Sequence, residues 1–179
     1  MQKTDKLISF RPVVAADVPM LRGWMVQDHW REWWGEVETE LGYIVDMIEG
    51  RDTTRPFIFQ LDGEDIGYIQ YWTIGDNLFE PWLSQAPWMT ELPADAIGVD
   101  LSIGENDGIS KGVGSAVLRA FTENLLREGF KNITIDPDCR NKRAVRAYEK
   151  AGFRRIESLF GKTGDTLLMQ FDANSVIED

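Results

Sequence analysis

The clearest alternation of apolar and polar residues runs through residues 97–104, which read IGVDLSIG. The odd positions are apolar and the even positions are glycine, Asp100 or Ser102, which is the period-two pattern of a strand with one buried face. Because successive side chains of a strand point to opposite faces, Asp100 is expected to point away from the core layer. The pattern predicts a strand over residues 97–103 with a carboxylate on its polar face.

Other short apolar or alternating runs predict further strands. The most distinctive of these is a β-hairpin, because an Asp-Gly turn at Asp62 and Gly63 separates two such runs. In its second run, Tyr68, Gln70 and Trp72 share one face. The predicted strands are residues 7–12, 56–61, 66–72, 132–136, 155–160 and 166–171.

Helical spacing of apolar residues appears in four segments. Asp17 and Asn141 stand where N-caps are expected, and Gly152 stands where a helix would end. The predicted helices are residues 18–25, 38–49, a segment from about 113 to 125, and 142–151.

The long segment of residues 73–96 is expected to be a loop. Pro81, Pro87 and Pro93 are expected to keep it irregular, and loops of this length in a compact domain are usually functional. We therefore expect it to form a lid or wall over a substrate site.

The order of these elements, β-α-α-β-β-β-α-β-α-β-β, predicts a single α/β domain. Its sheet is expected to be mixed, with helices on both faces. With 179 residues the chain is about one domain long, so we expect one domain over residues 1–179, with a folded core at about 7–172 and a polar tail at 173–179.

Charge is unevenly distributed in this chain of net charge −11. Residues 76–107 contain seven acidic residues and no Lys or Arg, whereas residues 139–155 contain seven basic residues against one Glu. The net charge argues against nucleic acid as a partner. An anionic, phosphate-bearing cofactor and a cationic co-substrate would explain both biases, although solvated charged faces would do so as well.

Composition limits the other classes of function. One cysteine and one histidine allow no intrachain disulfide and make a structural zinc site improbable, so we expect no metal. No apolar run is long enough for a membrane span, and we expect a cytoplasmic protein without a membrane partner.

A glycine-rich turn follows the strand of residues 97–103, with glycines at 108, 112 and 114 ahead of a helix. Such a turn can bind phosphate through backbone N–H groups and the helix dipole. It has neither the Walker nor the dinucleotide-binding pattern. An anion cradle and an ordinary turn with glycines for packing remain open at this point.

Three tryptophans lie within five residues in HWREWWG, residues 29–35. At least one should fill the core, and the others could form the wall of a ligand pocket. We expect His29 to be structural and Tyr71 to serve packing. Cys139 has no base partner nearby in the sequence, so we assign it no covalent role.

Two motifs together are similar to the signatures of the GNAT N-acetyltransferases. The first is GVG at residues 112–114, although Ile109 stands where the family usually has Gln or Arg; the second is NKRAVRAYEKAGF at residues 141–153. Further segments resemble the aminoglycoside 6′-N-acetyltransferases in particular: residues 29–35, GYIQ at 67–70, Asp100, Asp136-Pro137 and YEKAGF at 148–153. This similarity runs discontinuously from about residue 10 to 171 and is weakest at 73–96.

The resemblance implies a mixed, mostly antiparallel sheet with splayed central parallel strands. It also implies direct transfer of an acetyl group from acetyl-CoA to a primary amine, without a covalent enzyme intermediate. The residues it assigns to acetyl-CoA are Leu101, Ser102, Ile103, Ser110, Lys111, Gly112, Val113, Gly114, Ser115, Asn141 and Ala144, with the N–H of Ile103 facing the thioester oxygen.

The resemblance also assigns the catalytic and substrate-binding residues. Tyr148 would protonate the departing sulfur, and Asp100 would bind the 6′-ammonium group of an aminoglycoside. An ordinary carboxylate is about five pK units too weak to deprotonate an ammonium ion outright, so Asp100 first attracts and positions it. Asp136 would bind a second amino group, and the remaining contacts with the sugar would come from Trp34, Gln70 and Trp72.

Two rival functions stay open. One is acetylation of another cationic amine or hydroxylamine, such as the hydroxylysine of siderophore synthesis, and the other is a non-catalytic acyl-CoA-binding module. The acidic, aromatic composition favours a polycationic sugar. The sequence is compatible with a monomer or a homodimer.

Overall fold

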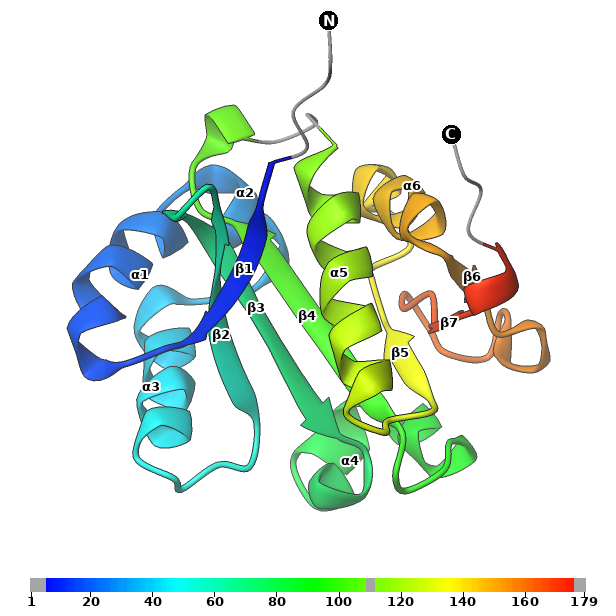
Figure 1. The fold of residues 1–179 in the computed structure, drawn as a ribbon. Helices are drawn as coiled ribbons and strands as arrows, with labels where there is room; N and C mark the ends of the chain where they lie inside the picture. The colour runs from blue at the N-terminus through cyan, green and yellow to red at the C-terminus, as the bar shows by residue number, and fades with distance from the viewer. Residues whose placement is uncertain (1–5, 109–111, 176–179) are drawn as a thin grey trace, which may run out of the picture. The chain divides into compact units, whose positions relative to one another are not determined.

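The computed structural model in Figure 1 describes residues 6–108 and 112–175. Its strands are arranged in one seven-stranded sheet in the order β1-β2-β3-β4-β5-β7-β6. The strands are β1 (Ile8–Pro12), β2 (Arg55–Leu61), β3 (Glu64–Thr73), β4 (Ile97–Ile103), β5 (Ile133–Ile135), β6 (Phe153–Arg155) and β7 (Met169–Phe171).

Two compact units make up the chain. The first, here called unit 1, falls within Met1–Gln70 and Leu101–Val113, and the second, unit 2, within Tyr71–Asp100 and Gly114–Asp179. The strands β3 and β4 therefore contribute residues to both units.

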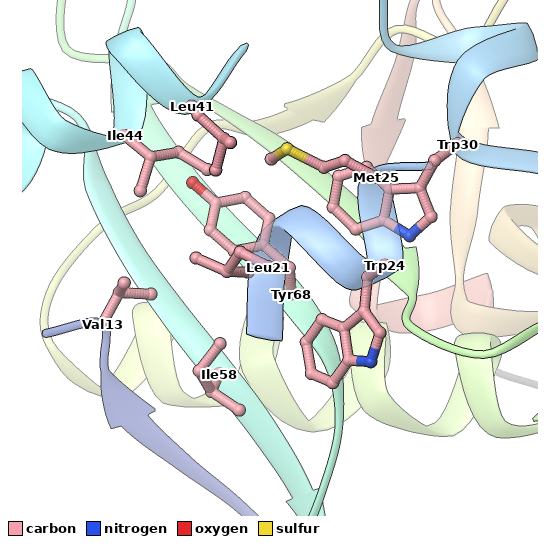
Figure 2. Packing of buried hydrophobic residues seen from close by; sticks show 9 residues of the cluster. All are labelled: Val13, Leu21, Trp24, Met25, Trp30, Leu41, Ile44, Ile58 and Tyr68. Atoms are coloured by element: carbon pink, nitrogen blue, oxygen red, sulfur yellow. The ribbon is translucent and has the colours of Figure 1, made fainter. Parts of the chain in front are cut away.

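Unit 1 packs three helices around a cluster of apolar side chains. The helices are α1 (Val18–Met25), α2 (Asp28–Trp33) and α3 (Val37–Ile48). Figure 2 shows Tyr68 of β3 among helical side chains such as Leu21 and Trp30. In α1 and α3 the buried apolar side chains are spaced three or four residues apart and so lie on one side of each helix, as expected for helices 18–25 and 38–49. Trp30 is 1% exposed, which confirms that one tryptophan of residues 29–35 fills the core.

A charged network joins β1 to the beginning of α1. Arg11 Nη1 lies 2.8 Å from Asp17 Oδ2, and Arg11 Nη2 lies 2.6 Å from Asp65 Oδ2. The carboxylate of Asp17 also accepts from the backbone N–H of Val14 at 2.9 Å. Asp17 does precede α1, but the expected side-chain cap is wrong: Asp17 has helical backbone angles and its oxygens are committed to Arg11 and Val14.

Unit 2 contains the parallel pair of the sheet. β4 pairs with β5 at Ile97–Ile133 and Gly98–Thr134, and β5 and β6 both pair antiparallel with β7. β5 is short because Pro137 follows it and cannot donate to a neighbouring strand. β4 continues to Ile103 beyond the last pair. A mixed, mostly antiparallel sheet is confirmed.

Two helices of unit 2 lie against opposite faces of its strands. On α5 (Val113–Arg127), the ring of Phe121 contacts that of Tyr71 at 6.2 Å, and Tyr71 also meets Phe130 at 5.5 Å. These contacts confirm the packing role of Tyr71. On the face that carries Asp100, α6 (Lys142–Ala151) places Tyr148 within electrostatic reach of that carboxylate.

The segment of residues 73–96 is more regular than expected. It contains α4 (Trp82–Gln85) and 3₁₀ turns at Gly75–Asn77 and Pro87–Glu91. Pro81 is the N-cap of α4 and Pro87 is the first residue of the second 3₁₀ turn, positions where a helix needs no N–H donor. A second apolar cluster anchors the segment through Ile74, Trp88, Met89, Ala96 and Leu168.

Two more sequence predictions need correction. Residues 28–33 form α2, which has too few turns to show helical periodicity in a tryptophan-rich sequence. The strand predicted at 155–160 is wrong except at Arg155, because β6 covers Phe153–Arg155 and a 3₁₀ turn occupies Glu157–Leu159. The strand predicted at 166–171 is confined to β7. Within residues 6–108 and 112–175, no helix is both long and apolar enough to cross a membrane.

Candidate active site

Asp100 lies on β4 and is held by a neighbouring tryptophan. The indole Nε1 of Trp72, near the end of β3, donates a hydrogen bond to Asp100 Oδ2 at 3.0 Å. Both side chains are half-buried, so the carboxylate keeps some exposure to solvent. The hydrogen bond orients the carboxylate of Asp100 on the polar face of β4.

Gly98 makes room for this tryptophan. A Cβ atom at position 98 would lie 2.3 Å from Cε2 and 2.7 Å from Nε1 of Trp72. The indole therefore lies across the backbone of Gly98, on the same face of β4 as Asp100. This arrangement agrees with the alternation that assigned Gly98 and Asp100 to one face.

Asp136 stands at the end of β5, beside Asp100. Gly98 pairs with Thr134, and each aspartate lies two residues further along its strand, on the same face. Burial raises the pKa of Asp136 well above its usual range, and the charge of Asp100 raises it further. Within the described residues, no lysine or arginine forms an ion pair with Asp136. The pair therefore presents an acidic surface that binds a proton or an ammonium ion.

Tyr148 faces the two aspartates from α6. Burial raises the pKa of its hydroxyl, the charges of Asp100 and Asp136 raise it further, and Arg143 opposes the shift. The hydroxyl thus stays protonated throughout the neutral and moderately alkaline range. A protonated phenol next to an acidic pair is suited to donate a proton to a developing anion.

Asn141 and Ala144 begin α6 together. The side chain of Asn141 accepts from the backbone N–H of Ala144 at 3.1 Å, which confirms the predicted N-cap. Their contact with acetyl-CoA stays a prediction. Any such contact would have to use groups other than the capping oxygen.

An aromatic cluster in unit 1 contains the other predicted substrate residues. The ring of Trp34 lies 4.8 Å from that of Trp30 and 5.7 Å from that of Tyr68. The Tyr68 hydroxyl donates to Gln70 Oε1 at 2.5 Å. Trp34 is only partly buried, so its exposed part can contact a ligand, and Tyr68 fixes the orientation of the Gln70 amide.

The end of β4 is tied to α2. His29 Nε2 lies 2.7 Å and Trp30 Nε1 lies 2.9 Å from the carbonyl oxygen of Ile103. The hydroxyl of Ser102 lies 3.3 Å from the same oxygen. His29 is therefore structural in the sense expected, with a main-chain partner.

The glycine turn is described from Gly112 onward, and the predicted residues Ser110 and Lys111 lie outside the described residues. Gly112 has φ 77°, a conformation that favours glycine. Among the described atoms, a Cβ at 112 or 114 would meet nothing within 4 Å. Contacts with the described atoms therefore do not explain these two glycines, and glycines at the start of a helix fit a backbone cradle for phosphate.

A family model described as an acetyltransferase (GNAT) domain matches residues 13–159. The chain belongs to the GNAT acetyltransferase family. The family assignment confirms the resemblance recognised in the two motifs at residues 112–114 and 141–153.

Curated relatives of this acetyltransferase include resistance enzymes. "Aminoglycoside N(6′)-acetyltransferase type 1" from Klebsiella pneumoniae is 30% identical over 170 residues, which cover 90% of this chain and 81% of the relative. A "kanamycin resistance protein" from Rhizobium radiobacter is 34% identical over 83 residues, covering 46% of this chain and 77% of the relative.

A solved structure resembles the acetyltransferase along most of its length. AAC(6′)-Ib in complex with coenzyme A and kanamycin superposes with a TM-score of 0.79 at 27% identity, covering 94% of this chain and 96% of that chain. Within the described part of the acetyltransferase, no group of three His, Cys, Asp or Glu side chains is arranged to hold a metal ion.

Sequence reasoning missed two contributors to the site of the acetyltransferase. Gly98 was read only as a polar-face position, yet it determines where Trp72 lies. Of the tryptophans at residues 29–35, at least one is expected to fill the core; Trp30 does so, and its indole N–H also binds Ile103. A glycine two positions from a functional carboxylate was the available signal for the first; nothing in the sequence indicated the second.

Proposed function

We propose that this protein is an aminoglycoside 6′-N-acetyltransferase, which transfers the acetyl group of acetyl-CoA to the 6′-amino group of an aminoglycoside. The observation that carries the proposal is the cluster of Asp100, Asp136 and Tyr148, with Asp100 oriented by Trp72. The similarity to an enzyme of this class over 90% of the chain supports the substrate class.

The acidic pair suits a substrate with several ammonium groups. Asp100 attracts and orients the 6′-ammonium, and Asp136 binds a second amino group of the sugar. The acidic bias of residues 76–107 adds to the attraction of a polycation. Trp34, Gln70 and Trp72 supply the remaining polar and aromatic contacts in this proposal.

The transfer then needs three proton movements, two from the nitrogen and one to the sulfur. The 6′-ammonium loses a proton to Asp100, directly or through water, and its nitrogen attacks the thioester carbonyl. The N–H of Ile103 stabilises the negative oxygen of the tetrahedral intermediate. When this intermediate collapses, the C–S bond breaks and Tyr148 gives its proton to the departing sulfur. The attacking nitrogen, which still carries two protons, releases one through water to the Tyr148 phenolate, so that an amide and a thiol remain.

For acetyl-CoA, the proposal uses the main chain of residues 101–103 and the turn that includes Gly112 to Ser115, together with Asn141 and Ala144. Ser110 and Lys111 belong to the same predicted turn. The open positions beside Gly112 and Gly114 support this placement of the phosphates. Because acetyl-CoA is an intracellular metabolite, we propose a cytoplasmic reaction.

Thiol release from acetyl-CoA by the purified protein tests the proposal. Kanamycin, tobramycin and gentamicin should support turnover, and an aminoglycoside with a 6′-hydroxyl in place of the 6′-amine should not. Turnover with N-hydroxylysine or spermidine but not with kanamycin would show that the substrate is another amine or hydroxylamine and not an aminoglycoside. Binding of coenzyme A without turnover of any amine would favour the non-catalytic module.

A further inference from the structure

The carbonyl of Ile103 has an unusual set of partners for the end of a strand. It accepts from the imidazole of His29 at 2.7 Å and from the indole of Trp30 at 2.9 Å. A carbonyl oxygen has two lone pairs, so these two donors satisfy it. Because a carbonyl can only accept, the proton of the imidazole is on Nε2.

The edge of β4 on which this carbonyl lies follows from the hydrogen bonds of the strand. Ile97 N–H donates to Asn132 on the β5 side, while Gly104 N–H donates to Ile66 on the β3 side. Odd residues of β4 therefore direct their N–H and C=O groups away from β3. The N–H and the C=O of Ile103 share this edge, so the two side chains of α2 hold the residue whose N–H is proposed to face the thioester.

The second nitrogen of His29 takes no part in the contact with Ile103. Nδ1 is buried and has no hydrogen-bond partner within the described part of the chain. A relay through the imidazole would need a next donor or acceptor at Nδ1.

We propose that His29 is a positioning residue of the acetyl transfer, which holds the Ile103 main chain in the orientation that receives the thioester of acetyl-CoA. The inference rests on the proposed function for the role of Ile103, but not on the identity of the amine. Without the imidazole, the Ile103 carbonyl loses its shortest hydrogen bond and keeps only Trp30 and the longer contact from the Ser102 hydroxyl. Its peptide can then turn, which would misplace the adjacent edge of β4.

Three substitutions at one position test the proposal. Glutamine can place its amide N–H where Nε2 of histidine lies, whereas asparagine is too short to reach the carbonyl and alanine has no donor. We expect H29N and H29A to weaken binding of coenzyme A about tenfold in calorimetry and to raise the KM for acetyl-CoA by a similar factor. We expect H29Q to stay within about threefold of the wild type.

Two further readouts separate positioning from other roles. The KM for kanamycin should change less than twofold in all three variants, and the pH profile of kcat should keep its shape. Equal coenzyme A binding by H29A and wild type would overturn the proposal, and so would an H29Q variant as impaired as H29N. If H29A does not fold, the comparison of H29Q with H29N decides.

Calorimetry with coenzyme A also keeps this inference apart from the proposed function. If no aminoglycoside is acetylated but H29N still binds coenzyme A about tenfold more weakly than H29Q, the positioning role stands and the substrate assignment fails. If kanamycin is acetylated and the variants bind coenzyme A like the wild type, the positioning role fails alone.

Discussion

The indole nitrogen of Trp72 donates a hydrogen bond to the carboxylate of Asp100 at 3.0 Å. This contact gives the aspartate a fixed orientation on the polar face of β4. It also stabilises the ionised carboxylate, because a hydrogen bond to the charged form favours that form. Burial raises the pKa of Asp136, so within the pair Asp136 is a favourable site for a proton.

Replacing Trp72 with phenylalanine removes the donor and keeps an aromatic ring. A hydrogen bond to a charged group is worth about 1.5–3 kcal/mol, so kcat/KM for kanamycin should fall roughly 10- to 100-fold. Steady-state kinetics would measure the change, and calorimetry should show unchanged binding of coenzyme A. The matched control is W82F, in α4, which should keep kcat/KM close to the wild-type value; an equal loss in both variants would contradict the prediction.

Gly98 should tolerate no side chain while Trp72 is present. In G98A the new Cβ would lie 2.3 Å from the indole, so the ring or the strand must move, at a cost of about 1–3 kcal/mol of stability. The loss of activity should be at least that of W72F. Denaturation of G98A, W72A and the double variant would check the cause, because G98A should cost less stability in the W72A background. Additive effects would refute the clash.

The face of β4 that carries the site could be predicted from the sequence, whereas the contacts that organise it could not. Period-two alternation is a local property, and it assigned Asp100 to the polar face. The roles of Asp136 and Tyr148 came from the resemblance to a family. The hydrogen bond between Trp72 and Asp100 depends on how separate strands align, which no local pattern encodes.

For the same reason, the connection between α2 and β4 could not be predicted from the sequence. His29 and Ile103 are 74 residues apart, and an adjacent histidine and tryptophan do not indicate which carbonyl they will meet. The helices at Trp82–Gln85 and Pro87–Glu91 were missed for a different reason, since both are short and both start at a proline, as N-cap or as first residue. A proline can mark the start of a helix, and it can equally mark a segment that forms no helix.

Tyr148 should contribute to the chemical step and not to binding. Phenylalanine at this position removes only the hydroxyl, and loss of a general acid typically costs 10²- to 10⁴-fold, so kcat should fall about 100-fold or more. The affinity for coenzyme A should stay within about twofold. Stopped-flow or steady-state assays would measure kcat, with Y71F as the matched control, because Tyr71 packs between Phe121 and Phe130.

The pH dependence of the Tyr148 contribution has a definite sign. Its pKa is raised, so the hydroxyl stays protonated as the pH rises from 7 to 9 and wild-type kcat should show no alkaline loss that Y148F lacks. An alkaline limb below pH 9 present only in the wild type would contradict this assignment.

Asp136 should make the protein less stable as the pH rises. Its pKa is raised in the folded state, so the folded protein binds the proton more tightly than the unfolded chain, and this advantage is lost between pH 4 and the raised pKa. The D136N variant has a neutral amide at position 136 at every pH, so it buries no charge there. It should therefore have a higher Tm than the wild type at pH 8 and little advantage at pH 4, while its affinity for kanamycin falls.

A neighbouring carboxylate supplies the control for this experiment. Asp138 has a pKa of about 2, because its side chain accepts hydrogen bonds from Arg140. Its shift is opposite in sign, so D138N should show no gain in Tm at pH 8. Thermal unfolding of the three proteins at both pH values would measure the effect, and an equal gain in D136N and D138N would mean that general charge reduction, and not the pair with Asp100, is responsible.

The network of Arg11 should stabilise unit 1 in a pH-dependent way. Hydrogen bonds from Arg11 are the main cause of the lowered pKa values of Asp17 and Asp65. R11M leaves both half-buried carboxylates without their cation and should cost about 2–3 kcal/mol at pH 7. Because both pKa values are lowered, this stabilisation is present above pH 4 and is lost as the pH falls through the folded-state values.

Urea unfolding at pH 7 and pH 3 should therefore show that the difference in unfolding free energy between R11M and the wild type is smaller at pH 3. R22M removes an exposed pair with Glu38 and should change stability by less than about 1 kcal/mol at either pH, so a comparable loss in R22M would show that the buried geometry of Arg11 is not the cause.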